Sequence, residues 1–139
     1  MAEADIQAGL QELLRGIVDV AFNNLDEGLT TIDAALERFI QTPEAEEAVP
    51  GLEQLRDGVQ EIQNGNEDQG FSDINLGFST LTEVAAGSPF EAGLAEFRSG
   101  FQDAIAGDFS QGFNSLLEGY VDLRLALVGL QQDSDSLFA

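Results

Sequence analysis

The sequence predicts an all-α protein made of three tandem helix-turn-helix hairpins, with about six helices in 139 residues. Three observations support this prediction: an internal repeat with a fixed period, apolar residues spaced by three and four positions, and turn-forming residues in the middle of each repeat. An apolar fraction of 43% is close to the globular average and supplies material for a core. We expect a single domain, arranged either as a right-handed solenoid or as a closed helical bundle.

The repeat is visible in three segments that align without a gap. GLQELLRG, GLEQLRDG and GLAEFRSG begin at Gly9, Gly51 and Gly93, so successive copies are 42 residues apart. Four columns are identical in all three copies, namely Gly9/Gly51/Gly93, Leu10/Leu52/Leu94, Gly16/Gly58/Gly100 and Gly28/Gly70/Gly112. The copies divide the chain at approximately 1–41, 42–87 and 88–132, and we expect 133–139 to form a flexible tail.

Each copy carries two apolar stripes with the spacing of a helix face. The stripe of the first helix runs through Leu13/Leu55/Phe97, Ile17/Val59/Phe101 and Val20/Ile62/Ala104. The stripe of the second helix runs through Leu29/Phe71/Phe113, Ile32/Ile74/Leu116, Leu36/Phe78/Tyr120 and Phe39/Leu81/Leu123. Steps of three and four residues place these side chains on one face of a helix. Each copy is therefore predicted to be an α-hairpin.

Residues that favour turns and helix starts punctuate this pattern. Between the stripes stand Asn23-Asn24, Gly65-Asn66 and Gly107-Asp108, which tolerate positive φ and suit a tight turn between helices. Between copies, Thr42-Pro43-Glu44 and Ser88-Pro89 have the order of an N-cap followed by proline at the first helical position. Helices should restart there, and Pro50 either interrupts or restarts the first helix of the second copy.

Two segments, GDFSQGFNSLLEGY at 107–120 and NNLDEGLTTIDAALE at 23–37, resemble the turn and second helix of a tetratricopeptide repeat. The three small-residue positions of that family fall on Gly16/Gly28/Ala35, Gly58/Gly70/Gly77 and Gly100/Gly112/Gly119. Small residues at these steps allow two helices to approach closely. The period is longer than the family's usual length of about 34 residues, and the apolar stripe of the first helix is rotated by about 100°.

In tetratricopeptide repeats, the positions that hold this rotated stripe face a concave ligand groove, so the resemblance implies an apolar groove here. Its predicted partner-binding residues are Leu13, Ile17, Leu55, Val59, Phe97 and Phe101, with Arg56 and Arg98 beside them. Three arrangements would cover so large an apolar row. The helices close into a six-helix bundle, two chains pair through the row, or the row binds a helix or peptide of a partner. The two arginines either pair with acids across the repeat interface or donate to a carboxylate of the partner.

The charge composition limits the classes of partner. The chain has 26 acidic residues against five basic ones, which gives a net charge of −21. All five basic residues are arginines. Such a field repels nucleic acid and anionic membranes and accelerates encounter with a basic protein. The same acidity is also typical of salt-adapted or highly soluble proteins, so charge alone leaves the partner open.

The sequence offers little for catalysis or for metal binding. Cysteine and histidine are absent, which excludes disulfides, thiolate nucleophiles and the usual general base near neutral pH. The stretch NGNEDQG at 64–70 is predicted to be a turn, because its glycine falls at the seventh position instead of the sixth of a calcium loop. We expect no enzymatic activity, no catalytic residue, no cofactor and no metal.

The sequence likewise indicates no membrane segment, since no apolar run approaches the length of about 18 residues that a span requires. The segment MAEADIQAGL has neither the basic nor the hydrophobic region of a signal peptide, and the compartment is left open. The leading functional expectation is a non-enzymatic scaffold or adaptor that binds a basic or amphipathic segment of a partner protein. The alternatives are a self-assembling structural or envelope protein that pairs through the first-helix face, and a nucleic-acid mimic.

Overall fold

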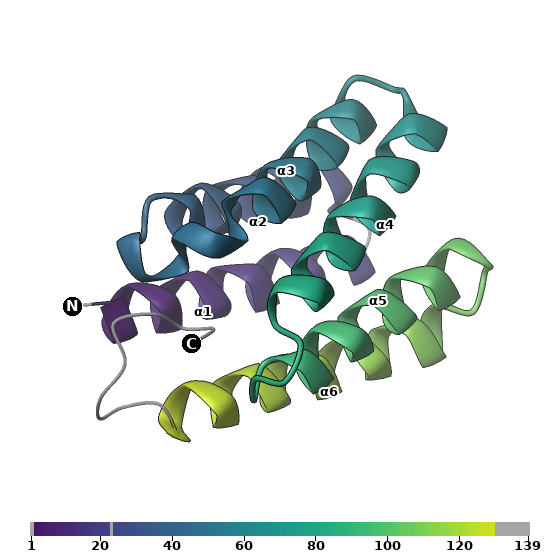
Figure 1. Ribbon diagram of the computed structural model, residues 1–139. Coiled ribbons are helices and arrows are strands. Elements are labelled where there is room, and N and C mark those ends of the chain that lie inside the picture. Colours follow the sequence, from purple (N-terminus) through teal and green to yellow (C-terminus); the bar gives the residue numbers. More distant parts are fainter. Residues whose placement is uncertain (1, 23, 130–139) are drawn as a thin grey trace.

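The protein is all-helical, as the sequence predicts. A computed structural model describes residues 2–22 and 24–129, and within them it shows six α-helices, one 3-10 helix and no strand. The elements are α1 (Ala2–Ala21), α2 (Leu25–Ile40), η1 (Pro43–Ala48), α3 (Val49–Gln63), α4 (Glu67–Val84), α5 (Glu91–Ile105) and α6 (Phe109–Gly129) (Figure 1). Each predicted copy contains one hairpin, and the predicted tail at 133–139 lies outside the described residues.

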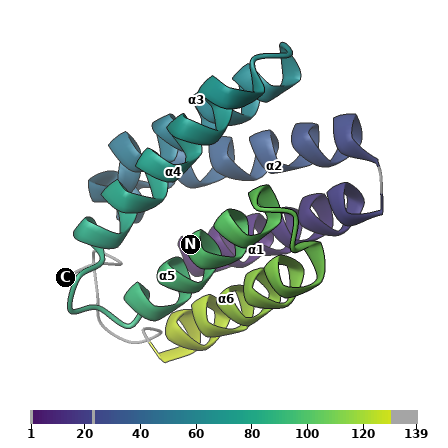
Figure 2. The same ribbon diagram turned by 90° about the vertical axis from the view of Figure 1, so that its right-hand side faces the viewer.

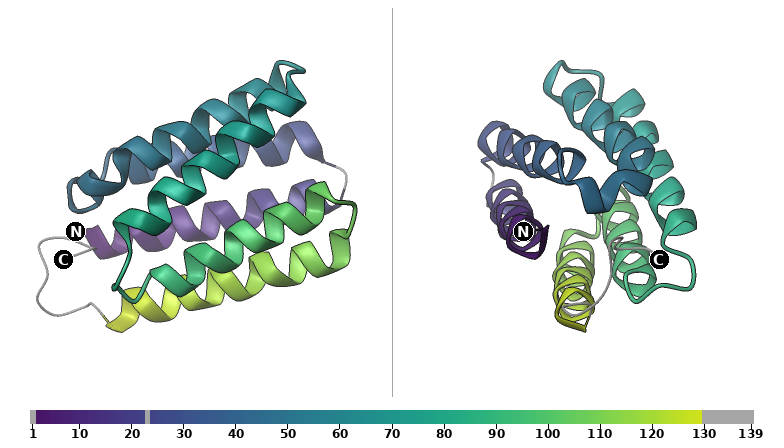
Figure 3. Two further views of the ribbon diagram at one scale, coloured as in Figure 1. Left: turned by 45° about the vertical axis from the view of Figure 1, so that its right-hand side comes forward. Right: turned by 60° about the vertical axis from the view of Figure 1, so that its left-hand side comes forward.

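The three hairpins, α1/α2, α3/α4 and α5/α6, are arranged in a closed ring. Along the chain, α2 packs against α3 and α4 packs against α5, and α6 returns to pack against α1. The right-hand view of Figure 3 shows the helices around a common interior. The second hairpin diverges from the third toward its turn, as Figures 1 and 2 show. Of the two arrangements that the sequence leaves open, the structure therefore has the closed bundle. The resemblance to tetratricopeptide repeats stays a prediction.

Glycines set the close approach of the two helices within each hairpin. A Cβ atom added to Gly58 would lie 2.7 Å from the carbonyl oxygen of Gly70, and one added to Gly100 would lie 2.6 Å from that of Gly112. In the first hairpin, Gly16 meets Gly28 in the same way, at 2.8 Å. Distances below 3 Å leave no room for a side chain, so these columns of glycine are required by backbone contact.

The turns and helix starts follow the predicted punctuation with two shifts, because Thr42-Pro43 opens the 3-10 helix η1 before α3 and because α5 starts late. Gly65 and Gly107 have φ of 90° and 98° in the turns of the second and third hairpins. Thr42 is the N-cap of η1, and α3 begins at Val49 with proline in its first turn. Helix α5 begins at Glu91, two residues after Pro89, because the amide of Phe90 donates to Ser88 Oγ at 3.2 Å in a preceding turn. The helix thus starts later than predicted.

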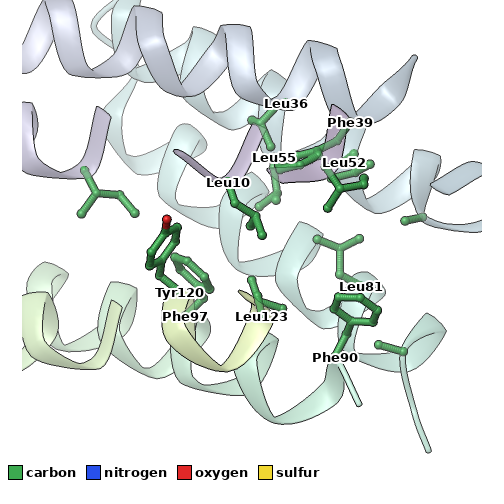
Figure 4. Packing of buried hydrophobic residues seen from close by; sticks show 14 of the residues in the cluster. Leu10, Leu36, Phe39, Leu52, Leu55, Leu81, Phe90, Phe97, Tyr120 and Leu123 are labelled. Atoms are coloured by element: carbon green, nitrogen blue, oxygen red, sulfur yellow. The ribbon is translucent and has the colours of Figure 1, made fainter. Parts of the chain in front are cut away.

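The core lies inside the ring and draws on every helix. Figure 4 shows leucine and aromatic side chains of the hairpins converging there. The labelled residues are Leu10, Leu36, Phe39, Leu52, Leu55, Leu81, Phe90, Phe97, Tyr120 and Leu123. Phe78 stacks on Phe97 with ring centroids 6.3 Å apart, and Phe71 meets Phe101 edge to face at 5.8 Å. These contacts join the second hairpin to the third.

Candidate functional site

The predicted groove residues lie in the interior of the ring. Ile17, Leu55, Val59 and Phe97 are buried, with between 3% and 8% of their surface exposed. Leu13 and Phe101 are half-buried and pack against the same core. Because α6 packs on α1, the first helices contribute this face to a shared core instead of presenting it as an open row. Their predicted role in partner binding requires an open arrangement that this structure does not show.

The two predicted arginines lie at the contact surfaces between hairpins, which we call seams. In the α2/α3 seam, Arg56 forms an ion pair with Glu37. In the α4/α5 seam, the Nε atom of Arg98 donates to the side-chain oxygen of Asn75 at 3.3 Å. The predicted alternative of pairing with acids across the repeat interface describes Arg56, whereas Arg98 lies at the equivalent interface and contacts an amide.

A second polar pair occurs at equivalent places in both seams. Gln60 donates to Asp33 at 3.4 Å in the α2/α3 seam, and Gln102 donates to Asn75 at 3.1 Å in the α4/α5 seam. Gln60 and Gln102 are one repeat apart, as are Asp33 and Asn75. The two seams are thus joined by the same polar contact, an exposed hydrogen bond from a glutamine amide to a carboxylate or amide oxygen.

The third seam, between α6 and α1, differs at each of these positions. In α1, one repeat earlier, Val18 occupies the position of Gln60 and Leu14 that of Arg56. In α6, Leu117 occupies the position of Asn75, and Val121 occupies that of Glu37 and Ser79. Between 6–20 of α1 and 110–126 of α6, no side-chain hydrogen bond or ion pair is formed. The positions that form polar contacts in the other two seams are therefore apolar in α1 and α6.

One face of α6 carries exposed apolar side chains. Val121 is 51% exposed and Leu125 is 64% exposed, whereas Leu117 is half-buried. Steps of four residues place the three on one side of the helix, and we call them the α6 strip. None of them is among the predicted partner-binding residues. Comparison of the three repeats in the sequence could identify these residues, because Leu117 occupies the position of the polar residues Asp33 and Asn75.

Three carboxylates stand beside this strip. Leu117 and Val121 line a shallow depression of about 270 Å³ together with Glu96 of α5 and with Glu118 and Asp122 of α6. We call these three acids the carboxylate cluster. A hydrogen bond with Asp122, partial burial and the nearby charge of Glu118 raise the pKa of Glu96 to about 7. Repulsion from its neighbours favours the protonated form of Glu96, and the cluster as a whole still places negative charge beside apolar surface.

Other kinds of site find no support in the described part of the chain. Its acidic side chains include no group of three or more arranged to hold a metal ion. None of its helices combines the length and hydropathy needed to cross a bilayer. Comparison of the chain with protein-family models, with curated proteins and with solved structures gave no match. The α6 strip and the carboxylate cluster are the features from which a function can be argued.

Proposed function

We propose that the protein is a non-enzymatic binding module that holds a basic, amphipathic segment of a partner protein. One observation carries the proposal: exposed valine and leucine side chains on α6 stand directly beside the carboxylate cluster. An apolar surface with an acidic rim is complementary to a segment whose apolar side chains are flanked by lysine or arginine.

The exposure of the apolar side chains supports this proposal. Single exposed hydrophobic residues are normal on protein surfaces and need no explanation. Val121 and Leu125, however, are one helical turn apart and adjoin the half-buried Leu117. This exposed apolar row supports the proposal of a contact surface, because its burial against a partner would remove apolar area from water.

The charge of the chain favours a cationic partner over a second copy of the protein. Each chain has a net charge of −21, so pairing of two chains through the α6 strip would bring two carboxylate clusters together. Like charges at an interface cost several kcal/mol, whereas lysine or arginine opposite Glu118 and Asp122 would gain charge-assisted hydrogen bonds. Self-assembly therefore remains the competing function, and its expected signature is a dimer that is stable only at high salt.

Calorimetric titration with synthetic peptides tests the proposal. The probe is a helical peptide of about 18 residues with apolar residues on one face and lysines and arginines on its flanks. We expect a Kd in the micromolar range. The Kd should rise about tenfold when the salt concentration rises from about 50 to 300 mM, because salt screens the attraction between the acidic protein and the basic peptide. A peptide of the same composition in scrambled order is the control.

The competing outcomes are distinct. Absence of binding by every amphipathic basic peptide at low salt would overturn the proposed function. Equal binding of the ordered and scrambled peptides would show attraction by charge alone, which also contradicts it. Light scattering on the protein alone, at low and high salt, detects the self-assembly that would favour the alternative.

A further inference from the structure

The apolar residues of the α6/α1 seam exceed what closure of the ring requires. If Leu117, Val121 and Leu125 served only to seal α6 against α1, packing of the two helices would bury them. Leu14 of α1 does pack against the core in this way. Val121 and Leu125 instead keep 51% and 64% of their surface exposed. Closure therefore explains one part of the seam and leaves the outer part unpartnered.

The same repeat positions are polar where a neighbouring hairpin already covers them. In the α2/α3 seam, the position of Val121 is occupied by Glu37, which pairs with Arg56. In the α4/α5 seam, the position of Leu117 is occupied by Asn75, which accepts hydrogen bonds from Arg98 and Gln102. Only in the third repeat are both positions apolar, as Leu117 and Val121. They lie on α6, which packs against α1 to close the ring.

We infer that the outer edge of the α6/α1 seam is the docking surface for one α-helix of the partner, which lies along α6 and covers Leu117, Val121 and Leu125. This inference rests on the proposed function and names its surface. The strip extends over about 12 Å, which matches two turns of a helix with apolar residues at i, i+4 and i+8. The partner helix would pack on the outside of the ring, through the same kind of apolar side-chain contact that holds neighbouring hairpins together.

The carboxylate cluster fixes which flank of the docked helix is cationic. Glu118 and Asp122 each follow a strip residue by one position, about 100° around α6, and Glu96 of α5 joins them on that side. Helix α1 packs against α6, and its residues Leu14 and Val18, which replace the polar residues of the other seams, are half-buried. The partner helix therefore carries lysine or arginine along one flank and apolar or small residues along the other.

The decisive experiment measures peptide affinity for surface variants of the full chain. Val121→Asp combined with Leu125→Asp places two charges on the strip and is expected to weaken binding of the amphipathic peptide at least about tenfold. The matched control is Leu76→Asp, because Leu76 is an exposed leucine on α4, 52% exposed, away from the seam. The control should change the affinity less than about twofold.

A second pair of variants separates the apolar contact from the charge contact. Glu118→Gln with Asp122→Asn should weaken binding and reduce its salt dependence, because two of the three acids lose their charge. If the aspartate variant loses helicity by circular dichroism, Val121→Ser with Leu125→Gln replaces it, with the same expected direction. Hydrogen exchange with and without the peptide should show added protection confined to α6 and α1.

Each outcome decides a different claim. Peptide binding to the wild-type chain that is unchanged in the Val121/Leu125 variants would overturn the docking surface and leave the proposed function standing. A proline at the centre of the peptide should abolish binding, and unchanged affinity would contradict docking of a helix. A dimer of the protein alone that the aspartate variant dissociates would show that the occupant is a second copy.

Discussion

The seam between the first two hairpins and the seam that closes the ring use the same repeat positions for different purposes. Between α2 and α3, the facing pairs are Arg56–Glu37 and Gln60–Asp33. The equivalent positions in α1 and α6 hold Leu14, Val18, Val121 and Leu117. A polar pair satisfies its own groups at a half-exposed seam, whereas an exposed apolar pair gains stability only when something covers it. Across the three repeats, the residues that build each hairpin recur, whereas the residues on its outer contact surfaces differ.

The largest expected effect distinguishes a buried residue of the first-helix stripe from an exposed residue of the α6 strip by the change in unfolding free energy. Phe97→Ala should lower the free energy of unfolding by about 3–5 kcal/mol, because it removes a ring that is 3% exposed and leaves a cavity in the core. Val121→Ala should change it by less than about 0.5 kcal/mol, since the side chain is half in water. Urea denaturation measures both. Similar costs for the two variants would mean that the strip is part of the core.

A smaller effect is expected from the polar pair of the α2/α3 seam. A double-mutant cycle with Arg56→Ala and Glu37→Ala should give a coupling energy of about 0.5–1 kcal/mol, because both side chains are partly exposed. The same cycle with Leu14→Ala and Val121→Ala should give less, and its value should not depend on salt. A larger, salt-dependent coupling in the second cycle would contradict the contrast between the seams.

The smallest expected effect concerns the acidic side of the strip. The pKa of Glu96 is raised from its ordinary value of 4.5 to about 7, so the folded protein binds a proton that the unfolded chain releases. The stabilising contribution of this proton is complete below about pH 4.5 and is lost as the pH rises through 7. Glu96→Gln keeps a neutral group at the site and should therefore flatten this part of the pH profile.

Thermal unfolding at pH 5 and pH 8 measures this difference. Above pH 7 the glutamine variant should be more stable than the wild type, by about 1 kcal/mol or less because solvent screens the cluster. Glu67→Gln is the control, since Glu67 is exposed in the first turn of α4 and lies outside the cluster. An equal stability difference at both pH values would show that Glu96 does not share a proton with its neighbours.

Much of the hairpin architecture could be read from the sequence because its determinants are local and recur three times. The stripes at steps of three and four, the breaks at Gly65 and Gly107 and the paired glycine columns each fix a helix, a turn or a close contact within some 30 residues. Helix α5 begins two residues later than the sequence predicts, since a hydrogen bond to Ser88 forms a turn that hydrophobic periodicity does not reveal.

The candidate site was harder to predict, because the same apolar stripe can line a groove or fill a core. Leu55, Val59 and Phe97 have the pattern of an amphipathic helix face in either case, and the pattern does not say what covers it. The residues of the α6 strip could have been found by asking where one copy departs from the polar character of the other two. That comparison gains meaning only with the exposure of Val121 and Leu125.

By itself, then, the sequence determined three glycine-paired hairpins, their register and the acidity of their surface, since each follows from residue type and spacing. Tertiary structure alone decided that the third hairpin returns to the first. Closure depends on the angles between hairpins, which accumulate over the whole ring from the shapes of many packed side chains. It is this closure that buries the first-helix stripe and leaves the outer face of α6 exposed.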